Sequence, residues 1–165
     1  MESGPNCLIS GHELIVAMNS FAAEKIEHQV TVIAQIPSEN FFVQPTGNDN
    51  WINSQQKLAY NAHTKKLDQL NKQLEVKSTI GAITGYLSNP AIIASGNDNI
   101  ALTVKVGGIE LKTSTTELVD VDNAKTGKTL GLEIIPTVPA SGYVAGNYQG
   151  MVNMIFESEA PPKKP

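Results

Sequence analysis

The end of the chain is the feature that most constrains its fold. The last strand-like run, Tyr148 to Phe156, is followed only by the tail ESEAPPKKP. That tail cannot supply another strand, because proline lacks the backbone donor of a β-ladder and its glutamates and lysines favour solvent. A β-sandwich that ended here would lack its last strand, and we expect that strand to come from the N-terminus of a neighbouring copy.

The segment VTVIAQIP, Val30 to Pro37, is the candidate for the missing strand. Four residues of one parity would line one face of an extended strand, namely Val30, Val32, Ala34 and Ile36. The proline then ends the run. The residues alone leave open the simpler alternative that this segment is an ordinary strand of its own domain.

Length and composition indicate one globular domain. The chain has 165 residues, of which 41% are hydrophobic and 17% charged, enough to bury a sizeable core. The net charge is -4 and the 12 basic residues are dispersed lysines, which argues against a nucleic-acid partner. The chain contains no run of about 18 apolar residues that would span a membrane.

Apolar runs of strand length alternate with turn clusters about every ten residues, which indicates an all-β fold. The predicted strands are 26–36, 41–44, 57–61, 73–80, 83–87, 100–106, 109–113, 130–135 and 148–156. Turn residues separate them, including GNDN at 47–50 and again at 96–99. Gly107-Gly108 predicts a hairpin turn. A short helix over 67–74 is an alternative there, because Leu67, Leu70 and Leu74 have helical spacing.

The last predicted strand has one core-like face, formed by Tyr148, Gly150, Val152, Met154 and Phe156. Gly150 leaves room on that face for the close approach of a neighbour. Together the strands predict an immunoglobulin-like sandwich of about seven strands in two antiparallel sheets.

The first 22 residues resemble a degenerate or mis-called leader. Ser20, Phe21 and Ala22 form a small-x-small pattern like that of a cleavage site, but the segment lacks a positive start and Glu13 interrupts its apolar part. The expected organisation is therefore a leader over 1–22, an N-terminal extension over 23–37, a sandwich over 38–157 and a disordered tail over 158–165. The one cysteine, Cys7, would leave with the leader.

The sequence offers no catalytic residues, no metal site and no cofactor site. KTGKT at 125–129 lacks the first glycine of a phosphate loop, and the GNDN and DVDN segments lack the glycine and distal glutamate of a calcium loop. The three histidines lie far apart, and no serine has the spacing of a hydrolase elbow. Trp51 follows a turn and is expected to pack rather than to bind a ligand.

Four segments in order give the chain a family resemblance: VTVIAQIP, KLAY at 57–60, VKVGGIELKTS at 104–114 and AGNYQGMV at 145–152. The chain resembles the major pilins of the class 5, or alternate, chaperone/usher fimbriae, including the colonisation-factor pilins. The resemblance implies an incomplete immunoglobulin-like sandwich that a neighbouring subunit completes by donor-strand exchange. The malformed leader and the APPKKP tail depart from the family pattern.

The resemblance also implies the roles of particular residues and partners. Val30, Val32, Ala34 and Ile36 would form the donor strand, and the face from Tyr148 to Phe156 would form the acceptor groove. The implied partners are identical subunits, a periplasmic chaperone, an outer-membrane usher and a minor tip adhesin. The implied location is a fimbrium on the cell surface, reached through the periplasm. The alternative is a monomeric or tip-located adhesin that binds a host carbohydrate or protein through loop residues such as Asn48, Asp49 and Trp51.

Overall fold

The computed structural model describes residues 38–47 and 49–164. The predicted donor residues Val30, Val32, Ala34 and Ile36, and the predicted strand over 26–36, lie outside this part of the chain. The elements in chain order are β1 (Phe41–Pro45), η1 (Trp51–Asn53), β2 (Tyr60–Asn61), β3 (Lys66–Leu67), β4 (Leu70–Ser78), β5 (Ile83–Leu87), β6 (Ile92–Ser95), β7 (Asp98–Val106), β8 (Ile109–Glu110), β9 (Thr116–Val119), α1 (Val121–Thr126), β10 (Lys128–Pro136) and β11 (Met154–Ser158).

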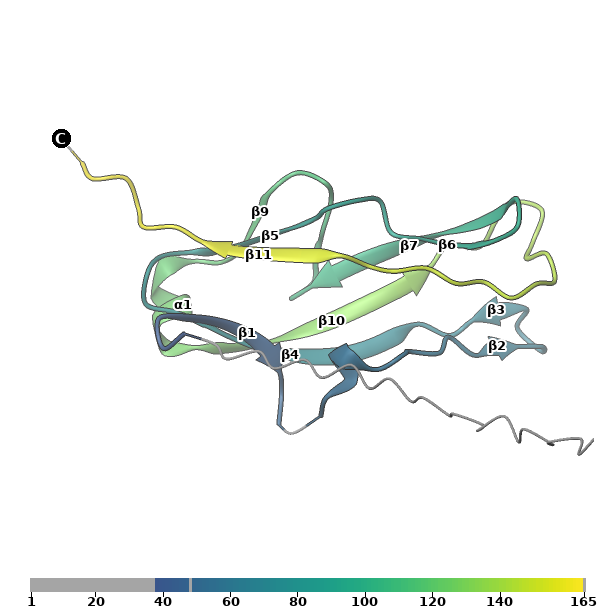
Figure 1. The fold of residues 1–165 in the computed structure, drawn as a ribbon, viewed down its shortest axis with the longest axis horizontal. Helices are drawn as coiled ribbons and strands as arrows, with labels where there is room; N and C mark the ends of the chain where they lie inside the picture. Colours follow the sequence, from purple (N-terminus) through teal and green to yellow (C-terminus); the bar gives the residue numbers. More distant parts are fainter. Residues whose placement is uncertain (1–37, 48, 165) are drawn as a thin grey trace, which may run out of the picture. The chain divides into compact units, whose positions relative to one another are not determined.

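The main strands form two antiparallel sheets (Figure 1). The larger sheet has the order β1-β4-β10-β7-β6, with β8 paired to β7, and the smaller sheet has the order β11-β5-β9. The short strands β2 and β3 form a separate hairpin. No helix in the described residues is long and apolar enough to cross a membrane.

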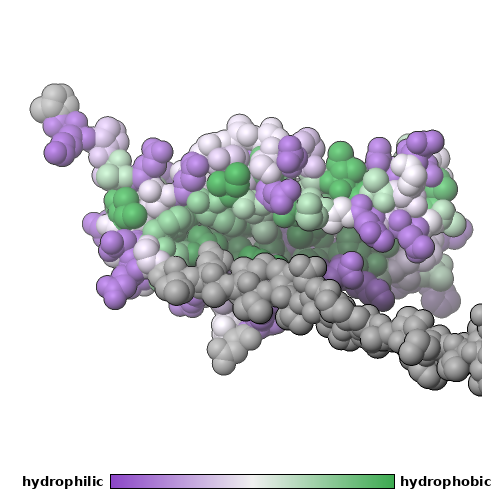
Figure 2. All heavy atoms as spheres, in the orientation of Figure 1, coloured by the Kyte–Doolittle hydropathy of each residue, from purple (hydrophilic) through white to green (hydrophobic). Residues whose placement is uncertain are grey.

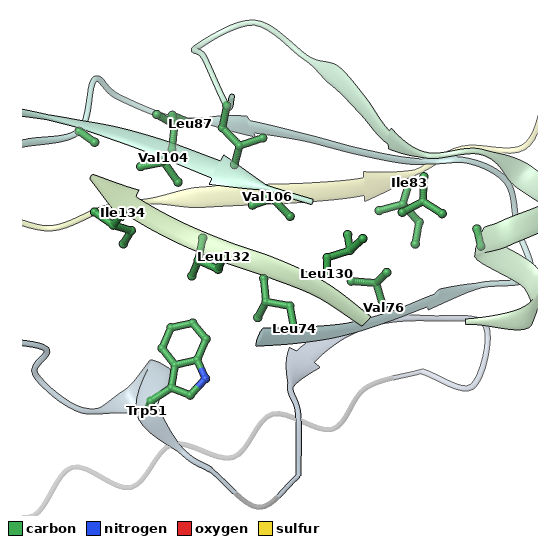
Figure 3. Close-up of a cluster of buried hydrophobic side chains, with 14 residues drawn as sticks. Trp51, Leu74, Val76, Ile83, Leu87, Val104, Val106, Leu130, Leu132 and Ile134 are labelled. Carbon is green, nitrogen blue, oxygen red and sulfur yellow. The ribbon is translucent and has the colours of Figure 1, made fainter. Parts of the chain in front are cut away.

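The core lies between the two sheets, because alternate residues of each strand point inward. In β4 and β10 these residues are Leu74, Val76, Leu130 and Leu132, and all are buried. Ile83 and Leu87 of β5 and Val119 of β9 belong to the same cluster from the smaller sheet (Figure 3). The apolar alternation that predicted the strands therefore also predicted which side chains form the core.

The molecule has two different ends, which we define by their residues. At the serine end, the start of β1 meets the end of β4, where Phe41 pairs with Ser78. Ser158, the last residue of β11, lies at the same end, because its Oγ is 2.6 Å from the Oγ of Ser78. At the hairpin end are the β2–β3 hairpin, which precedes the start of β4, and the segment 137–150, which follows the end of β10.

Most of the predicted strands are confirmed, some with changed ends. β1, β4, β5, β7 and β10 correspond to predicted runs, and the Gly107-Gly108 hairpin turn is present with φ values of 60° and 80°. The alternative helix over 67–74 is wrong. Its C-terminal part is strand β4, whose inward residue Leu74 is fully buried at the centre of the core.

Three predicted strands are shorter than expected, and for two of them the physical reason is visible. The run 109–113 forms a ladder only over Ile109–Glu110, because the chain then crosses to the smaller sheet, where the carbonyl of Lys112 accepts from the N–H of Leu87. The run 148–156 forms a ladder with β5 only from Met154, because its partner chain turns at 88–90 and Pro90 has no N–H to donate. The predicted strand over 57–61 is reduced to Tyr60–Asn61.

Strands β3, β6 and β9 and helix α1 were not among the predicted elements. The DVDN segment at 120–123 begins α1, since the Asp120 carboxylate accepts from the N–H groups of Asp122 and Asn123 at 3.1 and 3.0 Å. These bonds, above all those from Asn123, lower the pKa of Asp120. Gly127, with φ 83°, ends the helix.

Gly150 is expected to be intolerant of any side chain. A Cβ at this position would collide with the carbonyl oxygen of Ile92 and lie 3.0 Å from the Cα of Ile93. The Gly150→Ala variant should therefore be destabilised by about 1–3 kcal/mol, because the backbones of β6 and of this segment must separate. Thermal melting of the donor-completed subunit measures the effect.

Gly131→Ala is the matched control for Gly150→Ala. Gly131 lies in the central strand β10, and a Cβ there would have no atom within 4 Å. This variant should be neutral or more stable by about 0.4–1 kcal/mol, because alanine loses less backbone entropy on folding. Equal melting temperatures for the two variants would contradict the close packing of Gly150 on β6.

Candidate strand-acceptor groove

Strands β1, β9 and β11, at the borders of the two sheets, each have a neighbour on one side only among the described residues, and β1 and β11 are the two considered as an acceptor site. Among the described residues, β1 pairs only with β4 and β11 pairs only with β5. The two borders belong to different sheets, and at the serine end Ser78 of β4, which pairs with Phe41 of β1, contacts Ser158 of β11. Each edge therefore presents a row of backbone N–H and C=O groups that can pair with an added strand.

Apolar side chains from both edges point toward the core and are only partly buried. They are Phe41 and Val43 from β1, and Val152, Met154 and Phe156 from β11 and the residues before it. Figure 2 shows hydrophobic side chains gathered in a sunken band on this face, below the position of β11. An added strand between the edges would bury these side chains and pair the open backbone groups at once.

A buried cluster of hydroxyl and carbonyl groups fixes the end of β11. The Ser158 Oγ lies 3.0 Å from the carbonyl oxygen of Ala82 and 3.2 Å from that of Gly81, to which it can donate. The Ser78 Oγ accepts from the N–H of Ile80 at 3.1 Å and is itself fully buried. Since a slip of one residue would point Ser158 away from these partners, the cluster sets the register of β11 and hence the side chains that face the groove.

The outward face of β11 carries a polar pair. The hydroxyl of Tyr86 donates to the carboxylate of Glu157 at 3.3 Å, across the β5–β11 ladder. Desolvation, and then the negative charge of Glu157, raise the pKa of Tyr86. The pair lies on the opposite face of the strand from Met154 and Phe156, so the groove face remains apolar.

The structure separates the predicted acceptor residues into two groups. Val152, Met154 and Phe156 pack against the core beside the open edge, with Phe156 lying over Gly85. Tyr148 and Gly150 come earlier, beside β6. The Tyr148 hydroxyl donates to the carbonyl of Val144 at 2.8 Å, and the Gly150 backbone lies against Ile92.

Sequence reasoning missed the opposite side of the groove. Phe41 and Val43 were predicted to lie in a strand, but nothing in the sequence showed that this strand would be the border of the larger sheet. The local pattern carried only a weak signal, because Phe42 on the opposite face is as apolar as Phe41 and Val43. Ser158, placed in the tail by the sequence, is the last residue of β11.

The loop residues proposed as ligand contacts in the alternative function are engaged within the domain. Trp51 is buried (Figure 3). Its ring centroid lies 5.9 Å from the Nζ of Lys72. Lys72 also pairs with the carboxylate of Asp49 at 3.7 Å. The packing role expected for Trp51 is confirmed, and Asn48 lies outside the described residues.

The described residues hold no group of three or more His, Cys, Asp and Glu side chains placed to hold a metal ion. Two depressions lie on the outer face of the larger sheet. One is lined by residues of β4 and β10, and the other includes Phe42, Glu75 and Lys77. Both lie on the face opposite the apolar groove, since Phe42 alternates with the inward-facing Phe41 and Val43.

Among the described residues, β1 and β11 leave unpaired edges beside partly buried apolar side chains, an arrangement that suits the addition of a strand. The sequence profile of the family described as "CS1 type fimbrial major subunit" matches residues 26–157. The chain therefore belongs to the CS1 type fimbrial major subunit family. It is a structural subunit of a surface fimbrium, in which pilin subunits assemble as a homopolymer.

A solved structure supports the fold. The CooA pilin subunit from enterotoxigenic Escherichia coli is similar with a TM-score of 0.54 and 19% sequence identity, over 64% of this chain and 79% of that chain. The predicted all-β, pilin-type sandwich is thereby confirmed. No curated protein sequence matches the chain.

Proposed function

We propose that this subunit polymerises by donor-strand exchange, in which residues 30–36 of one copy fill the groove between β1 and β11 of the next. The observation that carries the proposal is the pair of unpaired edges with half-buried apolar side chains between them. The donor segment supplies apolar residues of one parity, Val30, Val32, Ala34 and Ile36, which suits a groove that is apolar on one side. Val152, Met154 and Phe156, with Phe41 and Val43 opposite, are the acceptor contacts nearest to the open edges.

The strand directions favour one orientation of the donor. The N-terminal extension leaves its own domain at the serine end, where β1 begins. If two serine ends met face to face, each subunit would place its donor strand in the groove of the other, and the pair would close as a symmetric dimer. A fibre needs unlike ends to meet, so the donor runs from the serine end of the acceptor toward its hairpin end, antiparallel to β11.

The expected strength of the joint follows from burial. Each of the two valines and the isoleucine of the donor contributes about 1.5–3 kcal/mol when fully buried. Ladder hydrogen bonds add about 0.5–1.5 kcal/mol each. Because these contributions are lost together on opening, the joint should open very slowly, as a fibre under shear requires.

The same exposed edges explain the partners and the route that we propose. A subunit with an open groove would aggregate unless another protein covered its edges, which is the role of a periplasmic chaperone, and an outer-membrane usher would then order the exchange. Export would use residues 1–22, the extension would span 23–37, and the tail after β11 would take no part in the groove. The tip adhesin of such a fimbria would be a separate chain, and this subunit would perform no catalysis.

A subunit that begins at residue 38 is expected to aggregate for the most part by itself, leaving a small soluble fraction, and to be fully soluble with a peptide of residues 26–37. The peptide fills the groove and pairs both edges, whereas the free subunit leaves them open. The measurement is soluble yield and cooperative unfolding with and without the peptide. A soluble, cooperatively folded monomer without peptide would show that the sandwich is already complete, and would favour the adhesin alternative.

A further inference from the structure

We infer that consecutive subunits also bind each other directly through unlike ends, with the hairpin end of the acceptor against the serine end of the donor's own domain. This inference rests on the proposed donor exchange and adds a second, separate interface to it. The occupant is a second copy of this chain, and the first reason is the very short connection between donor strand and domain.

The connection from the donor segment to β1 is very short. Only Pro37, Ser38, Glu39 and Asn40 separate Ile36 from Phe41. The Ser38 Oγ accepts from the N–H of Phe41 at 3.1 Å, and the carbonyl of Asn40 accepts from the N–H of Thr79 at 2.8 Å. Residues 38–40 are therefore fastened to their own domain. One extended residue spans only about 3.5 Å, so a donor strand seated in a groove brings the two domains into contact.

The hairpin end exposes apolar side chains where that contact must fall. Tyr60 of the β2–β3 hairpin is 55% exposed, and Val144 of the segment after β10 is 50% exposed. The ring of Tyr60 packs edge-on against that of Tyr143 at 6.2 Å, which joins the hairpin to this segment. Large apolar side chains clustered at one end of a domain are typical of a surface that another protein covers.

The serine end offers a matching feature. Ile80, in the turn between β4 and β5, is 41% exposed and lies next to the anchored residues Asn40 and Thr79. It is therefore beside the point at which the extension leaves the domain. The strand orientation proposed above brings this turn against the hairpin end of the acceptor.

The charges of the two ends are complementary. The hairpin carries the exposed Lys65 and Lys66 and one acidic residue, Asp68, whose N–H donates to the carbonyl of Ala59. The three segments that meet at the serine end, 38–40, 78–82 and 158–162, contain Glu39 and Glu159, and the lysines nearest in sequence, Lys77 and Lys163, lie just outside them. Unlike ends therefore attract, while two like ends repel, which favours a continuing fibre over a closed pair.

The test is chemical cross-linking within intact fibres of the full chain. In a Cys7→Ser background, the double variant Ile80→Cys/Val144→Cys places one thiol at each end. A short bismaleimide should then join consecutive subunits into a ladder of covalent oligomers on a denaturing gel. The matched control is Ile80→Cys/Gln73→Cys, because Gln73 is exposed in the middle of β4, away from both ends, and it should give no ladder.

The outcomes separate this inference from the donor exchange itself. Fibres that form normally but give no ladder with the Ile80/Val144 pair, or an equal ladder with the control pair, would overturn the end-to-end contact and leave donor exchange standing. Failure of the unmodified chain to form fibres would overturn both.

Charge reversal supplies a second readout. Lys65→Glu/Lys66→Glu and Glu39→Lys/Glu159→Lys should each slow fibre growth several-fold, and their combination should restore it, because the two ends become complementary again. Capture of a free donor peptide by the groove should be unchanged in all three variants. No rescue in the combined variant would count against the pairing of the ends.

Discussion

Val32→Asp is expected to abolish fibres while leaving the subunit able to fold with its chaperone. Val32 is central among the donor residues, and in the proposed joint its side chain enters an apolar groove bordered by Met154 and Phe156. An unpaired carboxylate there costs several kcal/mol, more than the burial of the valine contributed. Negative-stain microscopy of surface-sheared material measures the fibres, and co-purification with the chaperone measures folding.

Thr31→Asp is the matched control, because it adds the same charge one residue away on the opposite face of the strand. It should leave fibres largely intact. Normal fibres from Val32→Asp, or equal loss from both variants, would contradict the assignment of Val30, Val32, Ala34 and Ile36 as the side chains that enter the groove.

A second copy of residues 30–36, joined after Ser158 by a short flexible linker, is expected to convert the subunit into a stable monomer when residues 1–37 are removed. The structure favours this design, because β11 ends at the serine end, where an antiparallel donor begins. The tethered strand has a millimolar effective concentration and fills the groove of its own domain. Each of the three large donor side chains should contribute about 1.5–3 kcal/mol, and each kcal/mol raises the melting temperature by about 2–4 °C for a chain of this size. The melting temperature should therefore lie about 10–30 °C above that of the subunit with an unfilled groove.

The reference for this experiment is a scrambled strand on the same linker, which keeps the composition but not the alternation. Size-exclusion chromatography and thermal melting compare the two proteins. If the appended native strand gave no more stability than the scrambled one while both proteins stayed soluble, the groove between β1 and β11 would have no role as an acceptor.

Sequence alone was sufficient for the fold class and for much of the core. The period-2 alternation in 73–80, 100–106 and 130–135 shows which side chains are buried. Each strand of a two-layer sandwich has one buried face, and this holds regardless of which strands pair with it. The paired glycines 107 and 108 likewise fixed a turn through local backbone geometry alone. Strands β6 and β9 escaped notice because they are short and half-exposed, so their patterns are weak.

Only the tertiary structure showed which strands lie at the borders, and that decided the site. Val152, Met154 and Phe156 could be recognised as a core-like face from the sequence, but Phe41 and Val43 became groove residues only because β1 pairs with β4 and with no other described strand. The contact between Ser78 and Ser158 joins residues 80 positions apart, and it brings the end of β11 against the end of β4, the strand that pairs with β1. Alternation along one strand shows which face is buried. The identity of the neighbouring strand depends on pairing between distant segments, which no local pattern encodes.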